Sequence, residues 1–182
     1  VKAAGVVQPM TSNDYYWFWC DAQRPCKQWE AVVNLVDYVG INAFPWWENQ
    51  HAPACVPAEE APEMHLAMYK EVVATYPTKT VIITEFGWPG GPDGATEIND
   101  FTNKPCTGVA SESNQTYVLE KSIELLQKNK VPGITFCAFR ETWKTGHEGE
   151  IASYWGFCDN TPPYKCKKLF GYEGTGGEQQ DS

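Results

Sequence analysis

The chain has 182 residues, a formal net charge of −9 and 14% aromatic residues, including eight Trp. This length is sufficient for one domain with a buried core, and the negative charge argues against nucleic acid or an anionic membrane as a partner. No apolar run is long enough to span a bilayer. Because the first residues show neither an initiator Met nor a signal-sequence pattern, the chain is interpreted as a mature form or a fragment.

Four strands are predicted in chain order, at about residues 5–8, 36–42, 80–85 and 133–139. Helical patterns separate these strands. The first pattern begins at Trp29, the second opens with Pro62 at an early helical position, and the third follows Ser111, a suitable N-cap. Strands that alternate with helices predict an α/β fold with a parallel sheet and right-handed crossovers.

Loops rich in Pro and Gly follow each predicted strand on one side only, which places the working face at the carboxyl ends of the strands. Four βα units do not make a closed eight-stranded barrel, which usually needs about 250 residues. Residues 171–182 are rich in Gly, Gln and acidic residues without an apolar pattern. We therefore expect a folded part over residues 1–170, followed by a flexible tail or linker.

Seven cysteines favour an oxidising, extracellular compartment. Cys20 and Cys26 bracket one short loop and Cys158 and Cys166 bracket another, while the two remaining loop cysteines, 55 and 106, fall in long loops. The pairing stays open, because six cysteines allow 15 connectivities. Cys137 is interpreted as the odd free thiol within the last strand. The spacing of Cys and His does not fit a zinc site, so neither a metal nor a cofactor is expected.

Glu85 is the principal candidate for a catalytic residue. It ends the β-branched run 80–84 and is followed by a Gly- and Pro-rich turn, the position at which parallel α/β folds place catalytic groups. Burial of an ionised carboxylate is costly unless the group is paired or hydrogen-bonded. The alternative is a structural carboxylate that caps the following turn.

Four segments resemble family 17 glycoside hydrolases, the β-1,3-glucanases and β-1,3-glucanosyltransferases. Residues 36–47 (VDYVGINAFPWW) resemble the family's sixth strand, and 81–89 (VIITEFGWP) its seventh strand with the nucleophilic glutamate. Residues 138–144 (AFRETWK) resemble the eighth strand and 154–157 (YWGF) the closing segment. The sequence departs from the family pattern at three positions, with Phe86 in place of Thr, Arg140 in place of Asp, and Thr142 in place of Pro.

The resemblance implies that residues 1–170 are the C-terminal half of a TIM (β/α)8 barrel, with strands five to eight. It implies a secreted, possibly cell-wall-associated retaining glycosidase or transglycosylase that acts on β-1,3-glucan, with Glu85 as nucleophile. The family's acid/base glutamate belongs to the fourth strand, so it is expected from an N-terminal half-barrel, either a separate chain or a segment outside this one. The alternatives are a β-glucan-binding half-barrel without catalysis, and a disulfide-stapled recognition protein.

Three polar residues are expected at the substrate site. Lys144 or Arg140 is expected to supply a positive charge that keeps Glu85 ionised. Glu141 is placed in the cleft by the resemblance, with a surface ion pair to Lys144 as the alternative. Asn42 ends the strand next to that of Glu85, where its amide is expected to donate to a sugar hydroxyl or to Glu85, with a hydrogen bond to the backbone as the alternative.

Five aromatic residues complete the predicted substrate site, because the apolar faces of sugar rings suit aromatic platforms. One of Trp46 and Trp47 is expected to stack on a glucosyl ring. Packing within the protein is the alternative for both and is the favoured role of Phe44. Tyr15 is expected to line the cleft, and Trp88 to form its wall.

Overall fold

The computed structural model describes residues 4–5, 7–19, 29–51 and 53–170. The expected tail at 171–182 and the loop with Cys20 and Cys26 lie outside the described residues. The strands are β1 (Thr11–Tyr15), β2 (Tyr38–Ala43), β3 (Thr80–Phe86), β4 (Ile98–Asn99), β5 (Lys104–Pro105) and β6 (Gly133–Thr135). The α-helices are α1 (Tyr16–Trp19), α2 (Glu30–Leu35), α3 (Pro45–His51), α4 (Ala61–Thr75), α5 (Glu112–Lys128) and α6 (Thr145–Glu148). Two 3-10 helices, η3 (Thr142–Lys144) and η4 (Glu150–Tyr154), flank α6.

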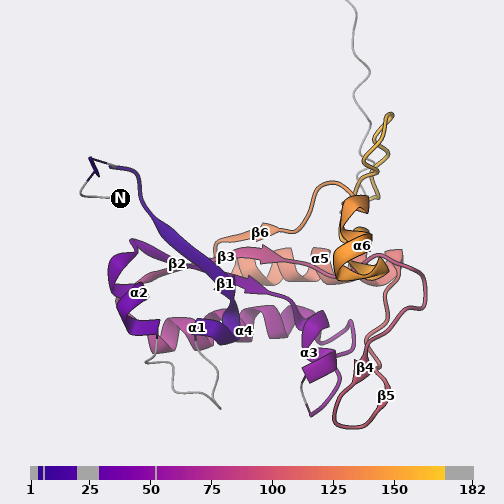
Figure 1. Cartoon of the computed structure of the whole chain (residues 1–182), viewed down its shortest axis with the longest axis horizontal. Helices are drawn as coiled ribbons and strands as arrows, with labels where there is room; N and C mark the ends of the chain where they lie inside the picture. Colours follow the sequence, from indigo (N-terminus) through magenta and orange to yellow (C-terminus); the bar gives the residue numbers. More distant parts are fainter. Residues whose placement is uncertain (1–3, 6, 20–28, 52, 171–182) are drawn as a thin grey trace, which may run out of the picture.

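The main sheet is parallel, with the strand order β1-β2-β3-β6. Helices α4 and α5 run along one face of this sheet, and the β4–β5 pair and α6 lie beyond the carboxyl ends of the strands (Figure 1). This arrangement confirms the prediction of a parallel α/β sheet. The three predicted helices correspond to α2, α4 and α5, with Pro62 in the first turn of α4 and Ser111 as the N-cap of α5.

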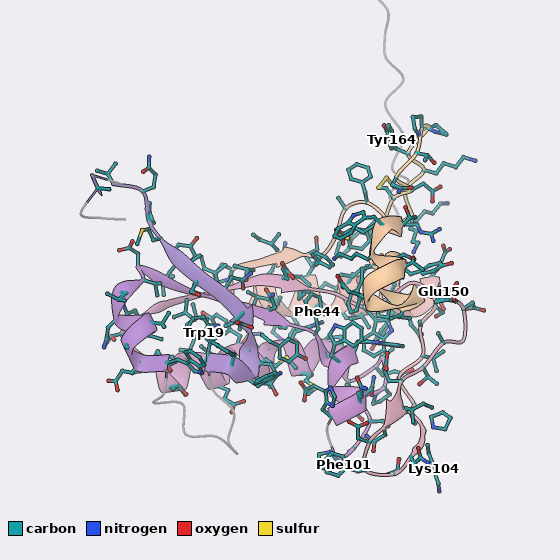
Figure 2. All side chains as sticks on the ribbon, viewed as in Figure 1. Trp19, Phe44, Phe101, Lys104, Glu150 and Tyr164 are labelled. Atoms are coloured by element: carbon teal, nitrogen blue, oxygen red, sulfur yellow. A yellow bond between two sulfur atoms is a disulfide. The ribbon has the colours of Figure 1, made fainter. Side chains whose placement is uncertain are left out.

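Alternation along β2 and β3 builds the core, which Figure 2 shows beneath the sheet around the labelled Trp19. Val39 and Ile41 of β2 and Val81 and Ile83 of β3 are at most 2% exposed. They form one apolar cluster with α4 residues Leu66, Met68 and Val72. The opposite face of these strands carries smaller or polar side chains such as Asn42 and Thr84. The helices therefore cover one face and leave the polar pattern on the other.

Two predicted strand boundaries were wrong. The first strand is Thr11–Tyr15 and not residues 5–8, where Gly5 lies in a turn at φ +82° and Val7 is 89% exposed. The strand β1 was not predicted because its residues are polar. It is an edge strand that is held by backbone pairing to β2. The last strand, β6, ends at Thr135, so Cys137 follows the strand instead of lying within it.

Two disulfides are present among the described residues, Cys55–Cys106 and Cys158–Cys166, and Cys137 is a free thiol, as expected. The first joins the chain after α3 to the end of the β4–β5 pair, across 51 residues of sequence. The second closes only 8 residues near the end of the described chain. No described helix combines the length and apolar character needed to cross a bilayer.

We expect removal of the longer disulfide to be the more destabilising, because the larger loop loses more entropy when it is closed in the unfolded chain. The entropic model gives about 4 kcal/mol for Cys55→Ala/Cys106→Ala and about 2.5 kcal/mol for Cys158→Ala/Cys166→Ala. Urea unfolding of both double variants and the parent measures this difference. The expectation would be contradicted if the two double variants lost equal amounts of unfolding free energy, or if Cys158→Ala/Cys166→Ala lost more.

Candidate active site

Glu85 lies near the carboxyl end of β3, beside Asn42 on the neighbouring strand β2. The register between β2 and β3 shifts at Ile41/Asn42, and this irregularity pairs Asn42 with Glu85 instead of Thr84. Such a shift re-aims side chains at the end of a strand. Glu85 is half-buried at the edge of the sheet where the loops gather.

An ion pair from the segment after β6 lies beside Glu85. Lys144 Nζ is 2.7 Å from Glu141 Oε2, and the two side chains are only 15% and 24% exposed. The ammonium group also lies 4.7 Å from the centre of the Phe136 ring. Glu141 therefore forms the ion pair with Lys144 that was given as its alternative, and it also lies close enough to act on Glu85 electrostatically.

Burial raises the pKa of Glu85 above its ordinary value. The positive charge of Lys144 opposes this shift, and the negative charge of Glu141 adds to it. Of the two cations considered, Lys144 is therefore the one that lies close to Glu85. Arg140 does not, because its guanidinium carbon lies 4.1 Å over the ring of Tyr154 instead.

The two neighbouring charges should shift the titration of Glu85 in opposite directions. Glu141→Gln removes a negative charge and lowers the pKa of Glu85, whereas Lys144→Met removes the positive charge and raises it. The measurement is a carbon-13 NMR titration of the Glu85 carboxyl in both variants and in the parent. Shifts of the same sign in both variants would contradict this electrostatic description.

Cys137 is part of the same cluster. Its thiol lies 3.6 Å from Glu141 Oε2 and donates to the carbonyl of Phe139 at 3.2 Å. Burial, together with the charge of Glu141, raises the pKa of the Cys137 thiol to about 12. The thiol is therefore neutral at ordinary pH and a poor nucleophile. The sequence identified this residue as free but gave no signal for its place beside Glu141.

Hydrogen bonds tie together the ends of the first three strands. Thr84 Oγ1 lies 2.6 Å from Asn13 Oδ1 and 3.2 Å from Asn42 Oδ1. Tyr15 donates its hydroxyl to the carbonyl of Phe44 at 2.7 Å and lies 3.0 Å from Glu48 Oε1. Burial, followed by the charge of Glu48, raises the pKa of Tyr15 well above its ordinary value.

Sequence reasoning missed Asn13, Glu48 and Thr84 as members of this network. Asn13 belongs to β1, a strand that was not predicted because its sequence is polar. Thr84 immediately precedes Glu85, the residue that was singled out in β3. The alternation of β3 places Thr84 on the polar face of the sheet, and this pattern was the one available signal.

Three of the predicted aromatic residues are buried in a second apolar cluster. Trp46 and Trp88 are 0% exposed and Phe44 is 7% exposed. The indole of Trp46 donates to Glu97 Oε1 at 3.0 Å, and that of Trp88 donates to the carbonyl of Val109 at 3.1 Å. Trp46 therefore has the packing role that was given as its alternative, and Phe44 has the packing role that was favoured for it. Trp88, which was expected to form the wall of the cleft, lies in this cluster instead.

Trp47 remains the candidate of its pair for stacking on a sugar. It is half-buried, and its ring centre lies 5.8 Å from that of Trp155. Trp143, one residue before Lys144, is 66% exposed and is a further aromatic surface beside the ion pair.

Comparison with known proteins gives concordant matches. A family model described as the BtgE/BtgC glycoside hydrolase domain matches residues 1–156. The chain is 27% identical over 169 residues to the cell surface mannoprotein MP65 of Candida albicans, a match that covers 88% of this chain and 36% of that protein.

Two solved structures of a Rhizomucor miehei enzyme have a similar fold. The family 17 β-1,3-glucanosyltransferase of Rhizomucor miehei is 25% identical, with a TM-score of 0.62 over 87% of this chain and 48% of that one. An active-site mutant of the R. miehei β-1,3-glucanosyltransferase in complex with laminaritriose is 23% identical, with a TM-score of 0.64 over 94% of this chain and 54% of that one. The chain thus spans roughly half the length of these structures and about a third of the mannoprotein.

Proposed function

The chain belongs to the family of BtgE/BtgC glycoside hydrolase domains, and from this premise we propose that it acts on β-1,3-glucan as a retaining glycosidase or transglycosylase. One observation carries the proposal. Glu85 lies half-buried near the carboxyl end of a central strand of a parallel sheet, with Lys144 close enough to favour its ionised form. The similarity to a β-1,3-glucanosyltransferase supports the choice of glucan as substrate.

In the proposed reaction, a carboxylate oxygen of Glu85 attacks the anomeric carbon and forms a covalent glycosyl-enzyme. The bond from the anomeric carbon to the leaving sugar oxygen breaks, and a general acid protonates that oxygen. Water or another sugar then displaces Glu85 from the anomeric carbon, and the group that acted as the acid takes up the proton of the attacking hydroxyl. This step completes hydrolysis or transfer. Lys144 acts on the first step, because an ionised Glu85 is the nucleophile and burial disfavours that form.

We assign the acid/base role to a glutamate outside this chain. It would belong to an N-terminal half-barrel that completes the barrel together with strands five to eight. Glu141 is a poor candidate for the acid, since its carboxylate is already engaged by Lys144 at 2.7 Å. Because this ion pair engages the carboxylate that acts on Glu85, an acid is not identified among the described residues. This favours a second candidate function, a β-glucan-binding half-barrel without turnover.

The stereochemistry of the product tests this proposal. The chain is combined with the N-terminal half-barrel that supplies the acid, and the pair is incubated with laminarin. Proton NMR records the first anomer that appears, while chromatography follows the chain lengths of the products. The proposal predicts that the β-anomer forms first. Initial formation of the α-anomer would exclude a glycosyl-enzyme on Glu85, and binding of laminarin without new products would favour the non-catalytic function.

We further propose that the protein acts outside the cell, at the cell surface. The two disulfides support an oxidising compartment. The similarity to a cell surface mannoprotein supports the same location.

A further inference from the structure

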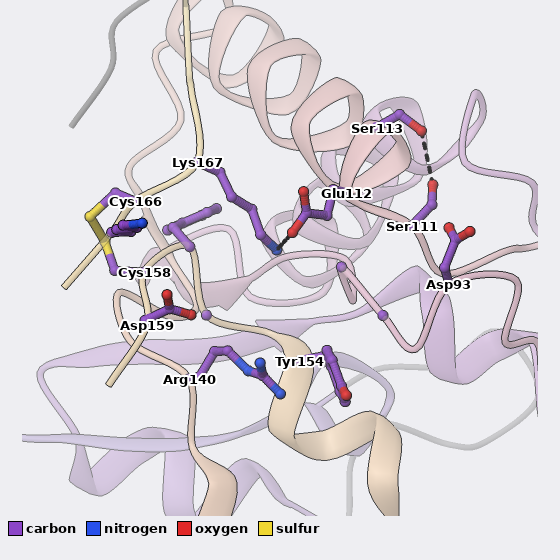
Figure 3. Close-up of a pocket in the computed structure, with 15 residues that line it drawn as sticks. Asp93, Ser111, Glu112, Ser113, Arg140, Tyr154, Cys158, Asp159, Cys166 and Lys167 are labelled. Atoms are coloured by element: carbon purple, nitrogen blue, oxygen red, sulfur yellow. Dashed lines mark hydrogen bonds and ion pairs between the residues drawn. A yellow bond between two sulfur atoms is a disulfide. The ribbon is translucent and has the colours of Figure 1, made fainter. Parts of the chain in front are cut away.

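A depression of the surface lies beside the first turn of α5, apart from Glu85. It has a volume of about 720 Å³, is open to solvent, and is lined by the first turn of α5, the loop after β3 and the segments that follow β6. Figure 3 shows labelled side chains from these three elements around the cavity, with Lys167 and Glu112 pointing toward one another. Small-molecule sites have volumes of about 300–1,000 Å³. Glu85, Glu141 and Lys144 are not among the residues that line it.

Charges of both signs line this cavity in equal number. The six charged lining residues are Arg140, Lys165, Lys167, Asp93, Glu112 and Asp159. A phosphate or sulfate would meet three carboxylates there, and an organic cation would meet three positive charges. The lining therefore favours a neutral ligand that both donates and accepts hydrogen bonds, and the hydroxyl groups of a saccharide do both.

Lys167 is a donor that the fold holds in place. Its ammonium group donates to Gln115 Oε1 at 2.6 Å and lies 3.7 Å from Glu112 Oε1. Gln115 is 1% exposed and donates to the carbonyls of Trp88 and Trp155, each at 2.9 Å. The core thus fixes the position of a cation that is itself only 20% exposed. A preorganised donor loses little freedom when a ligand binds.

Arg140 provides a second donor and part of the wall. Its guanidinium lies 4.1 Å over the Tyr154 ring, and its Nε is buried without a hydrogen-bond partner among the described residues. The resemblance to family 17 predicts Asp at this position. The substitution therefore places a positive charge in the cavity that the family pattern does not provide.

The cavity continues along α5. A shallower depression of about 490 Å³ shares Glu112, Ser113 and Lys167 with it and extends to Tyr117, which is 40% exposed. Together the two depressions form an elongated groove, which we call the α5 groove. An elongated groove with an exposed aromatic ring suits a chain of sugars better than a single sugar.

We propose that the α5 groove is a second saccharide-binding site, which holds a neutral oligosaccharide of the β-1,3-glucan type away from the reacting bond. The identification of the sugar as β-1,3-glucan rests on the proposed function. A bound chain there would keep the protein on its polymer while Glu85 reacts with another segment.

Ser113 offers a direct test, because it is exposed and lines both parts of the groove. Laminarihexaose is titrated into the Glu85→Gln protein, and nitrogen-15 NMR follows the backbone amides of Gly90, Gly91 and Glu112. These amides are expected to shift saturably. Adding Ser113→Arg, which fills the groove, should weaken this binding at least about tenfold. Gln127→Arg adds the same charge to the exposed far end of α5 and should leave the binding unchanged.

The outcomes separate this inference from the proposed function. The groove inference is overturned if the three amides do not shift, if Ser113→Arg binds as tightly as its parent, or if sodium phosphate shifts them and laminarihexaose does not. The single Ser113→Arg variant should release fluoride from β-laminaribiosyl fluoride at the parental rate, because the groove lies outside the site of bond cleavage. Loss of fluoride release in Glu85→Gln alone, with the amide shifts intact, supports both assignments.

Discussion

Replacement of Glu85 by Gln is expected to lower the rate of fluoride release from β-laminaribiosyl fluoride by about 10⁴-fold, because the amide cannot attack the anomeric carbon. The fluoride substrate isolates this step. Fluoride departs as an anion and needs no proton. Formation of the glycosyl-enzyme, which releases the first equivalent of fluoride per protein, therefore does not depend on an acid supplied from outside the chain. A fluoride electrode records the rate, and circular dichroism shows whether the variant is folded. Unchanged release in the folded variant would end the assignment of Glu85.

Glu141→Gln is the matched control for this variant. It removes the same charge from a neighbouring carboxylate that is already paired with Lys144 at 2.7 Å. We expect this variant to keep its rate within about tenfold of the parent, since it leaves the nucleophile in place and lowers the pKa of Glu85. If Glu141→Gln lost as much activity as Glu85→Gln, the two carboxylates would have equivalent roles and the present assignment would be wrong.

Acid is expected to destabilise the fold strongly through the buried side chain of His65. His65 lies in α4, is 0% exposed, packs edge-on against Phe86 at 5.3 Å and lies 2.8 Å from Ser122 Oγ. Burial lowers its pKa from 6.5 to about 3. Between these pH values the unfolded chain takes up a proton that the folded chain does not. The contribution of neutral His65 to the free energy of unfolding is therefore fully present above pH 6.5. Below that pH the free energy of unfolding falls by up to about 1.4 kcal/mol per pH unit, or about 5 kcal/mol by pH 3.

Urea unfolding at pH 7, 5 and 4 measures this loss in the parent and in His65→Gln. The amide does not titrate, so the free energy of unfolding of His65→Gln should decline less steeply, while the contributions of the carboxylates remain in both proteins. His51→Gln provides the matched control, because His51 is exposed and pairs with Asp100 at 3.0 Å. Parallel declines in the parent and His65→Gln would show that His65 does not drive acid unfolding.

The central strands of the fold could be predicted from the sequence because they are buried and rich in apolar or β-branched residues. The runs that form β2 and β3 stand out by their apolar residues, and Glu85 stands out as the carboxylate that ends one of them. The strand β1 escaped prediction since an edge strand needs only backbone pairing. Its sequence, TSNDY, contains no apolar alternation.

The aromatic residues were harder to predict, because their roles depend on how the loops fold back. Trp46 and Trp47 are adjacent in sequence, but Trp46 is buried against Trp88 while Trp47 is half-buried beside Trp155. The cation was similarly ambiguous. Arg140 and Lys144 both follow the last strand, and only the geometry of the turn directs Lys144 to Glu85 and Arg140 to Tyr154. No local pattern encodes such contacts between distant segments.

Covalent trapping tests the assignment of Glu85 most directly. The protein is incubated with a 2-deoxy-2-fluoro-β-laminaribiosyl fluoride, which forms the glycosyl-enzyme but slows its hydrolysis, and mass spectrometry locates the sugar after proteolysis. We predict one ester on the peptide that contains Glu85, and none in Glu85→Gln. A chain that stays unlabelled while fluoride is released, or a sugar attached to Glu141 instead, would contradict the proposal.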